Sequence, residues 1–581
     1  MDVIRSRPVL VILALVLSGT PAFAARTRSQ PRPQVTLPAA AEFRGMWVTR
    51  FEWPSPDQAQ CRARIDQILR TLARNHFNAA IFQVRGQADT LYPSPEEPWS
   101  PMMSPNGAEP GWDPLAYAVE IAHQQGLAFH AYINTHTIWQ HDRKEAPLVP
   151  SHLFYRHGDA ATPGCHDWLI HDDQGRPVQW GGDNYVWLAP GVPAAQAYIR
   201  RQVMHVVQQY DVDGVHFDRI RTAGAEFSHD PISVSRQEPG SEGNPANLDF
   251  GDWTRDQITR LLGDLYAQIV ETKPRLIVSA TPVGLYRQGR YPNYPDDFHY
   301  GYSKCYQDAQ AWMVAGAMDL IVPQIYWSDG GKPPDFSQVL PDWIAHSGGR
   351  HVCAGLVSSM IDKEIIHQVQ ETRKQGGTGE VFFSYGSFNR KGYFRLFSRP
   401  GGLYARQAAM PSMPWKESPT DGIVVGTLLD AVSAEPVVDA WVVRTGSGHV
   451  ALSSGDGLYS FLKVPPGTHA LTIRKRGYVE RLVDNVVVNA GQVVRVNAAM
   501  LRQPATRPAD MDEQVAESQP AGPPQPSDIL VADHAGASSP ARTSHGKGLG
   551  FLAWTGILLL AGSISATLVV YFLRRTGRPE V

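Results

Sequence analysis

The alternation of short apolar segments with helical stretches between Glu42 and about Phe397 is the feature that most constrains the fold. Eight segments have the length and apolar character of buried strands: "RGMWVTR", "NAAIFQVRG", "AFHAYINTH", "DGVHFDRIR", "LIVSATPVG", "DLIVPQIYW", "HVCAGLVSS" and "EVFFSYGSF". A strand–helix repeat produces parallel strands, and eight such units close a (β/α)8 barrel. We therefore predict an α/β protein in which residues 42–405 form a TIM barrel.

The helices between these strands carry their own signals. Ser55-Pro56 offers an N-cap and a proline at the first helical position, and Asp113-Pro114 does the same for the next helix, which Gly126 ends. The first of these helices repeats apolar residues on one face, at Ile65, Ile68, Leu69 and Leu72.

A doubly wound open sheet is the alternative fold for such a repeat. That fold normally carries a glycine-rich phosphate-binding turn after its first strand, and "RGMWVTRFEWPSP" contains none. The barrel is therefore the better prediction. A polar loop rich in Pro and Gly, from Thr222 to about Asn247, delays the helix after the fourth strand, and loops of that length usually serve function or are mobile.

A second domain follows the Pro-rich break "AMPSMPWKESPTDG", where the apolar pattern changes to period two. Five strands joined by turns such as Gly455-Asp456-Gly457 predict a small β-sandwich over residues 421–501. Residues 502–547 are rich in Pro, Ala, Ser and Gln without a hydrophobic period, so we predict a disordered linker there.

Both ends of the chain predict export and anchoring. Arg5 and Arg7 precede the apolar run "PVLVILALVL", and the small residues "AFA" offer a cleavage site, so residues 1–24 are a predicted signal peptide. Residues 549–573 are uncharged and long enough to cross a bilayer, and Arg574-Arg575 puts the tail on the cytoplasmic side. We expect an exported protein, anchored in the cytoplasmic membrane by its C-terminal helix, with its main domains extracytoplasmic.

Charge and cysteine usage exclude several classes of partner. The chain has 53 Lys and Arg against 56 Asp and Glu, with no basic run, so nucleic acid is not an expected partner. Four cysteines lie far apart and predict neither a zinc site nor a disulfide scaffold. Barrel amidohydrolases bring a histidine pair on the first strand, which "RGMWVTR" lacks. We therefore predict no metal and no cofactor.

Polar residues concentrate where the predicted strands end, which is where TIM barrels place their active sites. In "DGVHFD", strand alternation puts His216 and Asp218 on the inner face, toward the barrel mouth. The candidates for substrate binding at or just beyond the strand ends are Gln83, Arg85, Asn134, His136, His216, Arg221, Gln324, Tyr326 and Trp327. Carboxylates, amides and flat aromatic rings together suit a sugar substrate. The alternatives are a structural ion pair for Asp218 and a hydrogen-bonded core position for His216.

The sequence resembles the glycoside-hydrolase-like family ten, bacterial envelope proteins with a (β/α)8 barrel. The matching stretches span nearly all of the predicted barrel: "FRGMWVTRFEWP", "FNAAIFQVRGQADTLYPS", "PWSPMM", "WDPLAYAVEIAHQQGLAFHAYIN", "LAPGVPAAQAYI", "YDVDGVHFDRIR" and "DLIVPQIYW". The resemblance implies glycosidase action on cell-wall glycans, such as peptidoglycan, or on related polysaccharides. The chain departs from the family pattern at "NTHTI", at Ala189 and at "RIRTAG". Residues 421–501 resemble the carboxypeptidase regulatory-like (transthyretin-like) domain, which usually acts as a spacer or adhesive unit.

Two hypotheses for function follow. The first is a glycosidase that uses Asp218 as one of two catalytic carboxyl groups. The strand "DGVHFD" also resembles the nucleophile strand of the α-amylase superfamily, which implies Asp218 as nucleophile with His216 as its basic partner. Strands five and seven end in "SATPVG" and "GLVSS", without an acid. Asp89 is therefore the first candidate for the general acid, and Asp308 the next, unless Asp308 caps a helix. The second hypothesis is a catalytically inactive glycan-binding envelope protein, which these missing acids favour.

Overall fold

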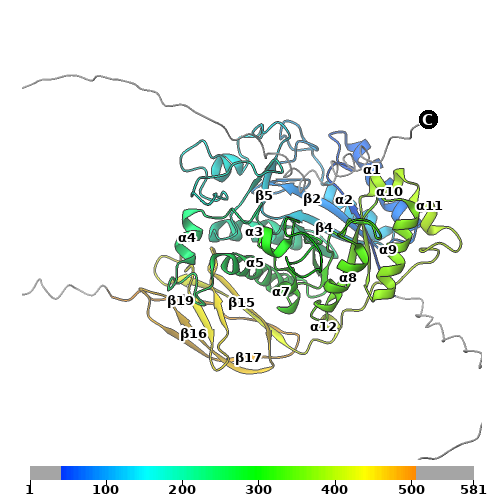
Figure 1. The fold of residues 1–581 in the computed structure, drawn as a ribbon. Helices are drawn as coiled ribbons and strands as arrows, with labels where there is room; N and C mark the ends of the chain where they lie inside the picture. The colour runs from blue at the N-terminus through cyan, green and yellow to red at the C-terminus, as the bar shows by residue number, and fades with distance from the viewer. Residues whose placement is uncertain (1–40, 505–581) are drawn as a thin grey trace, which may run out of the picture. The chain divides into compact units, whose positions relative to one another are not determined.

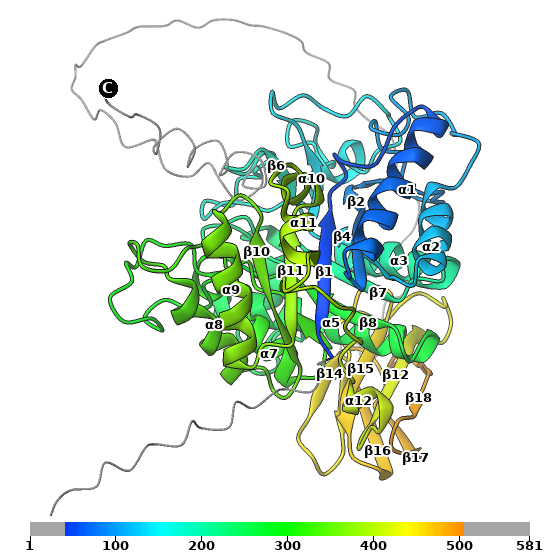
Figure 2. The same cartoon turned by 90° about the vertical axis from the view of Figure 1, so that its right-hand side faces the viewer.

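The computed structural model describes residues 41–504, which contain a closed barrel of parallel strands followed by a β-sandwich (Figure 1). The eight barrel strands are β1 (Phe43–Val48), β2 (Ala79–Gln87), β4 (Ala128–Asn134), β7 (Gly214–Asp218), β8 (Ile277–Ala280), β9 (Leu320–Ile321), β10 (His351–Val357) and β11 (Gly379–Phe383). β1 pairs in parallel with both β2 and β11, which closes the barrel, and Figure 2 shows β1 in blue beside β11 in yellow-green. The predicted TIM barrel and its eight strands are confirmed.

Helices connect the strands and cover the outside of the barrel. The longer ones are α1 (Gln58–Arg74), α2 (Pro114–Gln124), α3 (Pro193–Gln209), α5 (Phe250–Thr272), α8 (Phe336–Ala345) and α9 (Asp362–Gln375). The shorter ones are α4 (Pro231–Gln237), α6 (Gly301–Cys305), α7 (Ala309–Val314), α10 (Tyr385–Arg390), α11 (Tyr393–Ser398), α12 (Pro414–Glu417) and a π-helical turn, η1 (Phe154–Gly158). Two insertions extend the barrel mouth. The first is β3 (Asp89–Thr90), and the second is residues 137–187, which we call the hairpin because its two ends, β5 (Thr137–Gln140) and β6 (Tyr185–Trp187), pair antiparallel across a long connection.

The helix-start signals were right for α2 and wrong for α1. Asp113 caps α2 by accepting a hydrogen bond from the Ala116 backbone N–H at 3.0 Å, as predicted. The cap of α1 is Asp57 and not Ser55, so that helix begins two residues later than expected. The Ser55 hydroxyl donates instead to the Gln60 side chain, which leaves the first turn to the Asp57 carboxylate.

Two apolar layers hold the barrel together. Inner-facing residues fill its interior, among them Phe43, Trp47, Ala79, Ile81, Tyr132, Val322 and Val381. Alternate residues of the same strands join the outer layer under the helices, including Val215 and Phe217 of β7. The predicted face of α1 is buried in this outer layer. Strand alternation therefore decides which layer each side chain enters.

A β-bulge in β2 reverses this alternation. Gln83 pairs with Tyr132 of β4, but Arg85, two residues on, pairs with the very next residue, Ile133. Tyr132 belongs to the interior and Ile133 to the outer layer, so the bulge turns Arg85 outward. There its guanidinium forms an ion pair with Glu97 at 2.6 Å, with side chains 1% and 0% exposed. The structure thus places Arg85 in a buried ion pair and not on the inner face of β2.

The buried pair predicts a large stability effect. Glu97→Gln removes the charge that compensates the Arg85 guanidinium, so we expect the free energy of unfolding to fall by roughly 3–5 kcal/mol. Glu96→Gln, at the next position, is the matched control, because Glu96 pairs with Arg201 near the surface, where side chains are 33% and 50% exposed. Its loss should stay below about 1 kcal/mol. Urea denaturation of the purified protein measures both, and equal losses would contradict the structural role of the pair.

The sandwich consists of two four-stranded sheets. One contains β12 (Gly422–Asp430), β15 (Leu458–Val464), β18 (Val493–Arg495) and β19 (Ala498–Met500), and the other contains β13 (Trp441–Arg444), β14 (Val450–Leu452), β16 (Gly467–Arg474) and β17 (Arg481–Val488). The sequence did not predict β14 or β17. The sequence does not indicate β17 because this strand lies at a sheet edge, where most of its residues are exposed and the alternation of apolar and polar residues is weak.

Three predicted segments lie outside residues 41–504: the signal peptide, nearly all of the linker, and the membrane helix 549–573. Over the part of the chain that the structure describes, we find no helix with the length and apolar character needed to cross a bilayer.

Candidate active site

Asp218 lies at the C-terminal end of β7, where the barrel opens. It is half-buried, and it pairs with Asn134 at the end of the neighbouring strand β4. Its Oδ2 accepts a hydrogen bond from the Tyr132 hydroxyl at 2.7 Å, and its Oδ1 accepts from the Arg219 backbone N–H at 2.7 Å. Burial and the Asp218 charge raise the pKa of Tyr132 well above its usual value, so the phenol stays a donor. These two hydrogen bonds thus hold the carboxylate in one orientation.

Arg219 joins the end of β7 to the inserted hairpin. Its backbone is left-handed, with φ of 56°, which is uncommon for a residue other than glycine. The guanidinium lies over the ring of Tyr185 at 4.4 Å and over Trp187 at 5.5 Å. It also forms an ion pair with Asp183 at 2.8 Å. A second carboxyl group therefore lies on the guanidinium of the residue that follows Asp218.

Sequence reasoning missed Asp183. Its carboxylate also accepts from the Trp187 indole N–H at 3.1 Å and from the Tyr185 backbone N–H at 3.2 Å, so several donors fix its position. The only signal in the sequence is "GGDN", a turn motif before the short apolar strand "YVW". That signal marks a turn and says nothing about its proximity to β7.

His216 lies inside the barrel and does not contact Asp218 through any hydrogen bond. Its Nε2 is 2.9 Å from the Trp47 indole nitrogen, and its Nδ1 is 2.9 Å from the Ser279 hydroxyl. An indole can only donate, so Nε2 carries no proton and Nδ1 does. Burial lowers the pKa of His216 well below its usual value, which keeps the ring neutral. The basic partner expected for Asp218 is therefore a hydrogen-bonded core histidine, the alternative considered above.

Asp89 is a buried carboxyl group on β3, just beyond the bulged end of β2. The Gln87 amide donates to its Oδ2 at 3.3 Å. Burial raises the pKa of Asp89 to about 7, although the positive charge of Arg50 opposes the shift. Arg50 in turn donates to Gln140 of the hairpin at 2.9 Å and to the Tyr185 hydroxyl at 3.4 Å. Arg50 thus links the surroundings of Asp89 to the aromatic ring that stacks on Arg219.

Asp308 has a structural position. It is the N-cap of α7, and its Oδ1 accepts from the Ala311 backbone N–H at 3.0 Å and from the Tyr286 hydroxyl at 2.8 Å. Helix capping, the alternative left open by the sequence, is what the structure shows for Asp308.

Gln83 and Asn134 meet at the barrel mouth, with the Gln83 amide nitrogen 3.4 Å from the Asn134 carbonyl oxygen. Both are buried and already satisfied by the backbone: Gln83 accepts from the Arg50 N–H at 3.1 Å, and Asn134 donates to the Gly86 carbonyl at 2.7 Å. They support the β2 and β4 ends and leave little free capacity for hydroxyl groups.

His136 and Arg221 lie next to the two strands of the hairpin: His136 directly precedes β5, and Arg221 contacts Trp187 of β6. His136 is buried, with its Nδ1 3.1 Å from the Thr135 hydroxyl, and burial lowers its pKa to about 3. The Arg221 guanidinium stacks over Trp187 at 4.9 Å and donates to the Thr222 carbonyl at 3.0 Å. Arg219 and Arg221 thus lie over the same Trp187 ring, and the His136 backbone N–H donates to the Arg219 carbonyl at 3.4 Å.

Gln324, Tyr326 and Trp327 follow β9 and are half-buried. Burial, together with the negative charge of Asp218, raises the pKa of Tyr326 well above its usual value. The two side chains are therefore close enough to interact electrostatically. The Tyr326 ring lies 6.3 Å from that of Phe383 at the end of β11. A half-buried carboxylate beside half-buried aromatic rings is the arrangement that suits a pyranose.

Within residues 41–504, we find no cluster of three or more His, Cys, Asp or Glu side chains arranged to hold a metal ion. All four cysteines are free thiols, and three of them, Cys61, Cys305 and Cys353, are buried.

The structure is a closed TIM barrel with Asp218 at the end of one strand and aromatic rings beside it, which is the class of barrel protein that has a candidate sugar site at its mouth. The chain belongs to the glycosyl hydrolase-like 10 family, whose model matches residues 42–372. Residues 423–501 match the carboxypeptidase regulatory-like domain. These two family resemblances, predicted from the sequence, are confirmed.

Named relatives are glycosyl hydrolases. "Glycosyl hydrolase YngK" of Bacillus subtilis (strain 168) is 27% identical over 405 residues, which cover 65% of this chain and 74% of the relative. "Glycosyl hydrolase DigH" of Escherichia coli (strain K12) is 29% identical over 366 residues, which cover 59% of this chain and 79% of the relative. Among solved structures, alpha-L-fucosidase isoenzyme 2 from Paenibacillus thiaminolyticus aligns with a TM-score of 0.40 and 15% identity, over 61% of this chain and 50% of the other.

The raised pKa of Asp89 predicts an unusual dependence of stability on pH. Its folded value of about 7 lies above that of an unfolded aspartate, about 3.9, so the folded state binds this proton more tightly between those values. The stabilising contribution is complete below pH 4 and is lost as pH rises through 7. Asp89→Asn removes this loss, so the variant should gain roughly 2–4 kcal/mol relative to the wild type between pH 4 and pH 8.

Denaturation of both proteins at pH 4, 6 and 8 measures this difference. Asp173→Asn is the control, because Asp173 is exposed, and it should follow the wild type at every pH. A gain in Asp89→Asn that does not change with pH would contradict the raised pKa.

Proposed function

We propose that this protein is a glycosidase that hydrolyses O-glycosyl bonds of cell-wall or related glycans, with Asp218 as one of its two catalytic carboxyl groups. The observation that carries the proposal is the geometry of Asp218: it ends β7, it is half-buried at the barrel mouth, and two hydrogen bonds orient it. TIM-barrel enzymes carry their chemistry at this face. Membership of a glycosyl hydrolase-like family supports the reaction class.

Glycoside hydrolysis needs two carboxyl groups with different protonation states. Asp218 accepts one hydrogen bond through each of its two oxygens, which orients the group to stabilise or attack the anomeric carbon. Asp89, with a pKa of about 7, suits the general acid, because near neutral pH it carries a transferable proton in a substantial fraction of molecules. We therefore assign Asp89 as the acid.

Asp183 is the alternative second carboxyl group. It lies on the same guanidinium that follows Asp218, but its oxygens are occupied by Arg219, Trp187 and the Tyr185 backbone. A carboxylate held by an arginine and two other donors has few free lone pairs and little freedom to approach a glycosidic oxygen. Its better-supported role is to position Arg219.

Single substitutions separate these roles. Peptidoglycan glycan strands are incubated with the purified protein, and new reducing ends are counted. Asp218→Asn should lower kcat on the order of a thousandfold, because it removes the carboxylate that meets the anomeric carbon. Asp89→Asn should lower kcat and abolish the decline in rate above pH 7. Asp308→Asn, which changes only the N-cap of α7, is the control and should keep near-normal kcat.

Near-normal turnover by Asp218→Asn, with an unchanged melting temperature, would overturn the assignment of Asp218. If Asp183→Asn rather than Asp89→Asn removed the alkaline limb of the pH profile, the general acid would be Asp183.

The second candidate function is glycan binding without catalysis. One observation favours it: β8 and β10 lead into "SATPVG" and "GLVSS", so two strand ends that could supply an acid carry none. The same incubation distinguishes the two functions, since saturable binding of the glycan strands without any new reducing ends would favour the binding protein.

We further propose that the protein is exported and held in the cytoplasmic membrane by residues 549–573, with barrel and sandwich outside. The uncharged run, the arginines that follow it and the N-terminal export signal support this orientation. Protease added to intact spheroplasts should then release a soluble fragment that contains barrel and sandwich, seen by immunoblotting with antibody to the barrel. A barrel that stays protected until the membrane is broken would show the opposite orientation.

A further inference from the structure

The sandwich is docked firmly on the barrel. Arg200 of α3 has a side chain that is 1% exposed, and it donates to the Ser454 hydroxyl at 2.7 Å and pairs with Asp456, both in the sandwich. A Cβ on Gly455 would lie 2.2 Å from the Pro193 carbonyl oxygen, so the two backbones touch. α5 packs against β12 and β15. A domain used only as a spacer would not need contacts this tight.

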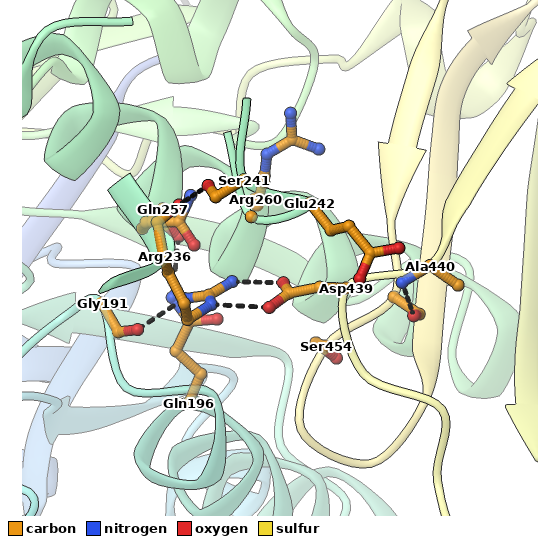
Figure 3. A network of polar contacts seen from close by, with 12 residues as sticks. Gly191, Gln196, Arg236, Ser241, Glu242, Gln257, Arg260, Asp439, Ala440 and Ser454 are labelled. Carbon is orange, nitrogen blue, oxygen red and sulfur yellow. Dashed lines mark hydrogen bonds and ion pairs between the residues drawn. The ribbon is translucent and has the colours of Figure 1, made fainter. Parts of the chain in front are cut away.

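One arginine connects the sandwich to two segments of the barrel. Arg236 lies on α4, in the long loop that follows β7. Its guanidinium donates to both carboxylate oxygens of Asp439, at 2.9 and 2.6 Å. The remaining nitrogen donates to the Gly191 carbonyl. Figure 3 shows Arg236 between these two partners, with Asp439 reaching over from the sandwich. Both side chains of this pair are 12% exposed, so water screens the pair only slightly.

The sandwich holds the same loop at a second point. The Trp441 indole donates to the Glu242 carbonyl at 2.7 Å, and Lys475 pairs with the Glu242 carboxylate at 2.8 Å. The Arg476 backbone N–H also donates to that carboxylate. Both Arg236 and Glu242 therefore fix the loop after β7 to one surface of the sandwich.

The two segments that Arg236 joins are the same two that meet at the candidate site. The loop after β7 begins at Arg219, and Gly191 lies shortly after β6, which supplies Tyr185 and Trp187. Arg219 links these segments at the barrel mouth through Asp183, and Arg236 links them again farther out. Asp439 of the sandwich holds that outer link.

We propose that the sandwich is a positioning element of the active site, and that Asp439 is its key positioning residue. Asp439 fixes Arg236, which fixes the Gly191 carbonyl and the loop after β7, and so holds the hairpin and Arg219 in the arrangement that orients Asp218. This inference rests on the function proposed above insofar as it concerns turnover. Its structural part, the coupling of the sandwich to the hairpin, stands independently.

Hydrogen–deuterium exchange of the full-length protein tests the coupling without any substrate. In Asp439→Ala, exchange should rise both in residues 219–242 and in residues 183–191, while the barrel strands keep their protection. Asp439→Glu retains the carboxylate and should restore much of the protection of both segments against exchange. Arg495→Ala is the matched control, because Arg495 of β18 pairs with Glu271 of α5 across the same junction at an exposed position. It should leave both segments unchanged.

Turnover of peptidoglycan glycan strands tests the consequence. Asp439→Ala should lower kcat on the order of ten- to a hundredfold with little change in KM, because a displaced catalytic group costs rate more than binding. Unchanged exchange in residues 183–191 of Asp439→Ala would overturn the proposal, as would unchanged kcat alongside increased exchange. Increased exchange in a protein whose wild type shows no turnover would refute the proposed function and leave the coupling intact.

Discussion

The guanidinium of Arg219 is the group on which the candidate site depends. The backbone N–H of Arg219 orients Asp218. The Arg219 guanidinium forms an ion pair with Asp183 and stacks on Tyr185 and Trp187. A buried guanidinium without a partner carries a desolvation penalty of several kcal/mol, so the end of β7 requires the hairpin. The left-handed backbone at Arg219 is the local strain that this arrangement maintains. The barrel and its insertion therefore form one unit around this side chain.

The fold could be predicted because its signals are local. Strands, helix faces and the cap at Asp113 depend on residues a few positions apart, and the sequence shows them directly. The bulge in β2 could not be predicted, because Val84 looks like any other strand residue, yet its insertion moves Arg85 from the mouth to a buried ion pair. Asp183 was missed for another reason: it lies 36 positions from Arg219, and only the folded hairpin brings the two together.

His216 shows what strand alternation determines and what it leaves open. Alternation correctly put its side chain on the inner face of β7. It did not give the depth, and the interior of a TIM barrel is filled by successive layers of side chains. His216 lies below Asp218, in the layer where Trp47 and Ser279 satisfy both ring nitrogens. Position 218 reaches the mouth because it is the last residue of the strand, and position 216 does not.

The proposed chemistry divides its carboxyl groups between the barrel and its insertions. Asp218 comes from a barrel strand, whereas Asp89 lies on β3 and Asp183 beside the β5–β6 hairpin, which packs on β2. Their surroundings differ as the reaction requires: donors surround Asp218, and burial dominates at Asp89 and raises its pKa to about 7. Strand ends without an acid at β8 and β10 are therefore compatible with catalysis, since an insertion can supply the second carboxyl group. An insertion can supply that group only if its position is fixed. Arg50 and Arg219 provide this from within the barrel, and Arg236, held by the sandwich, provides it from outside.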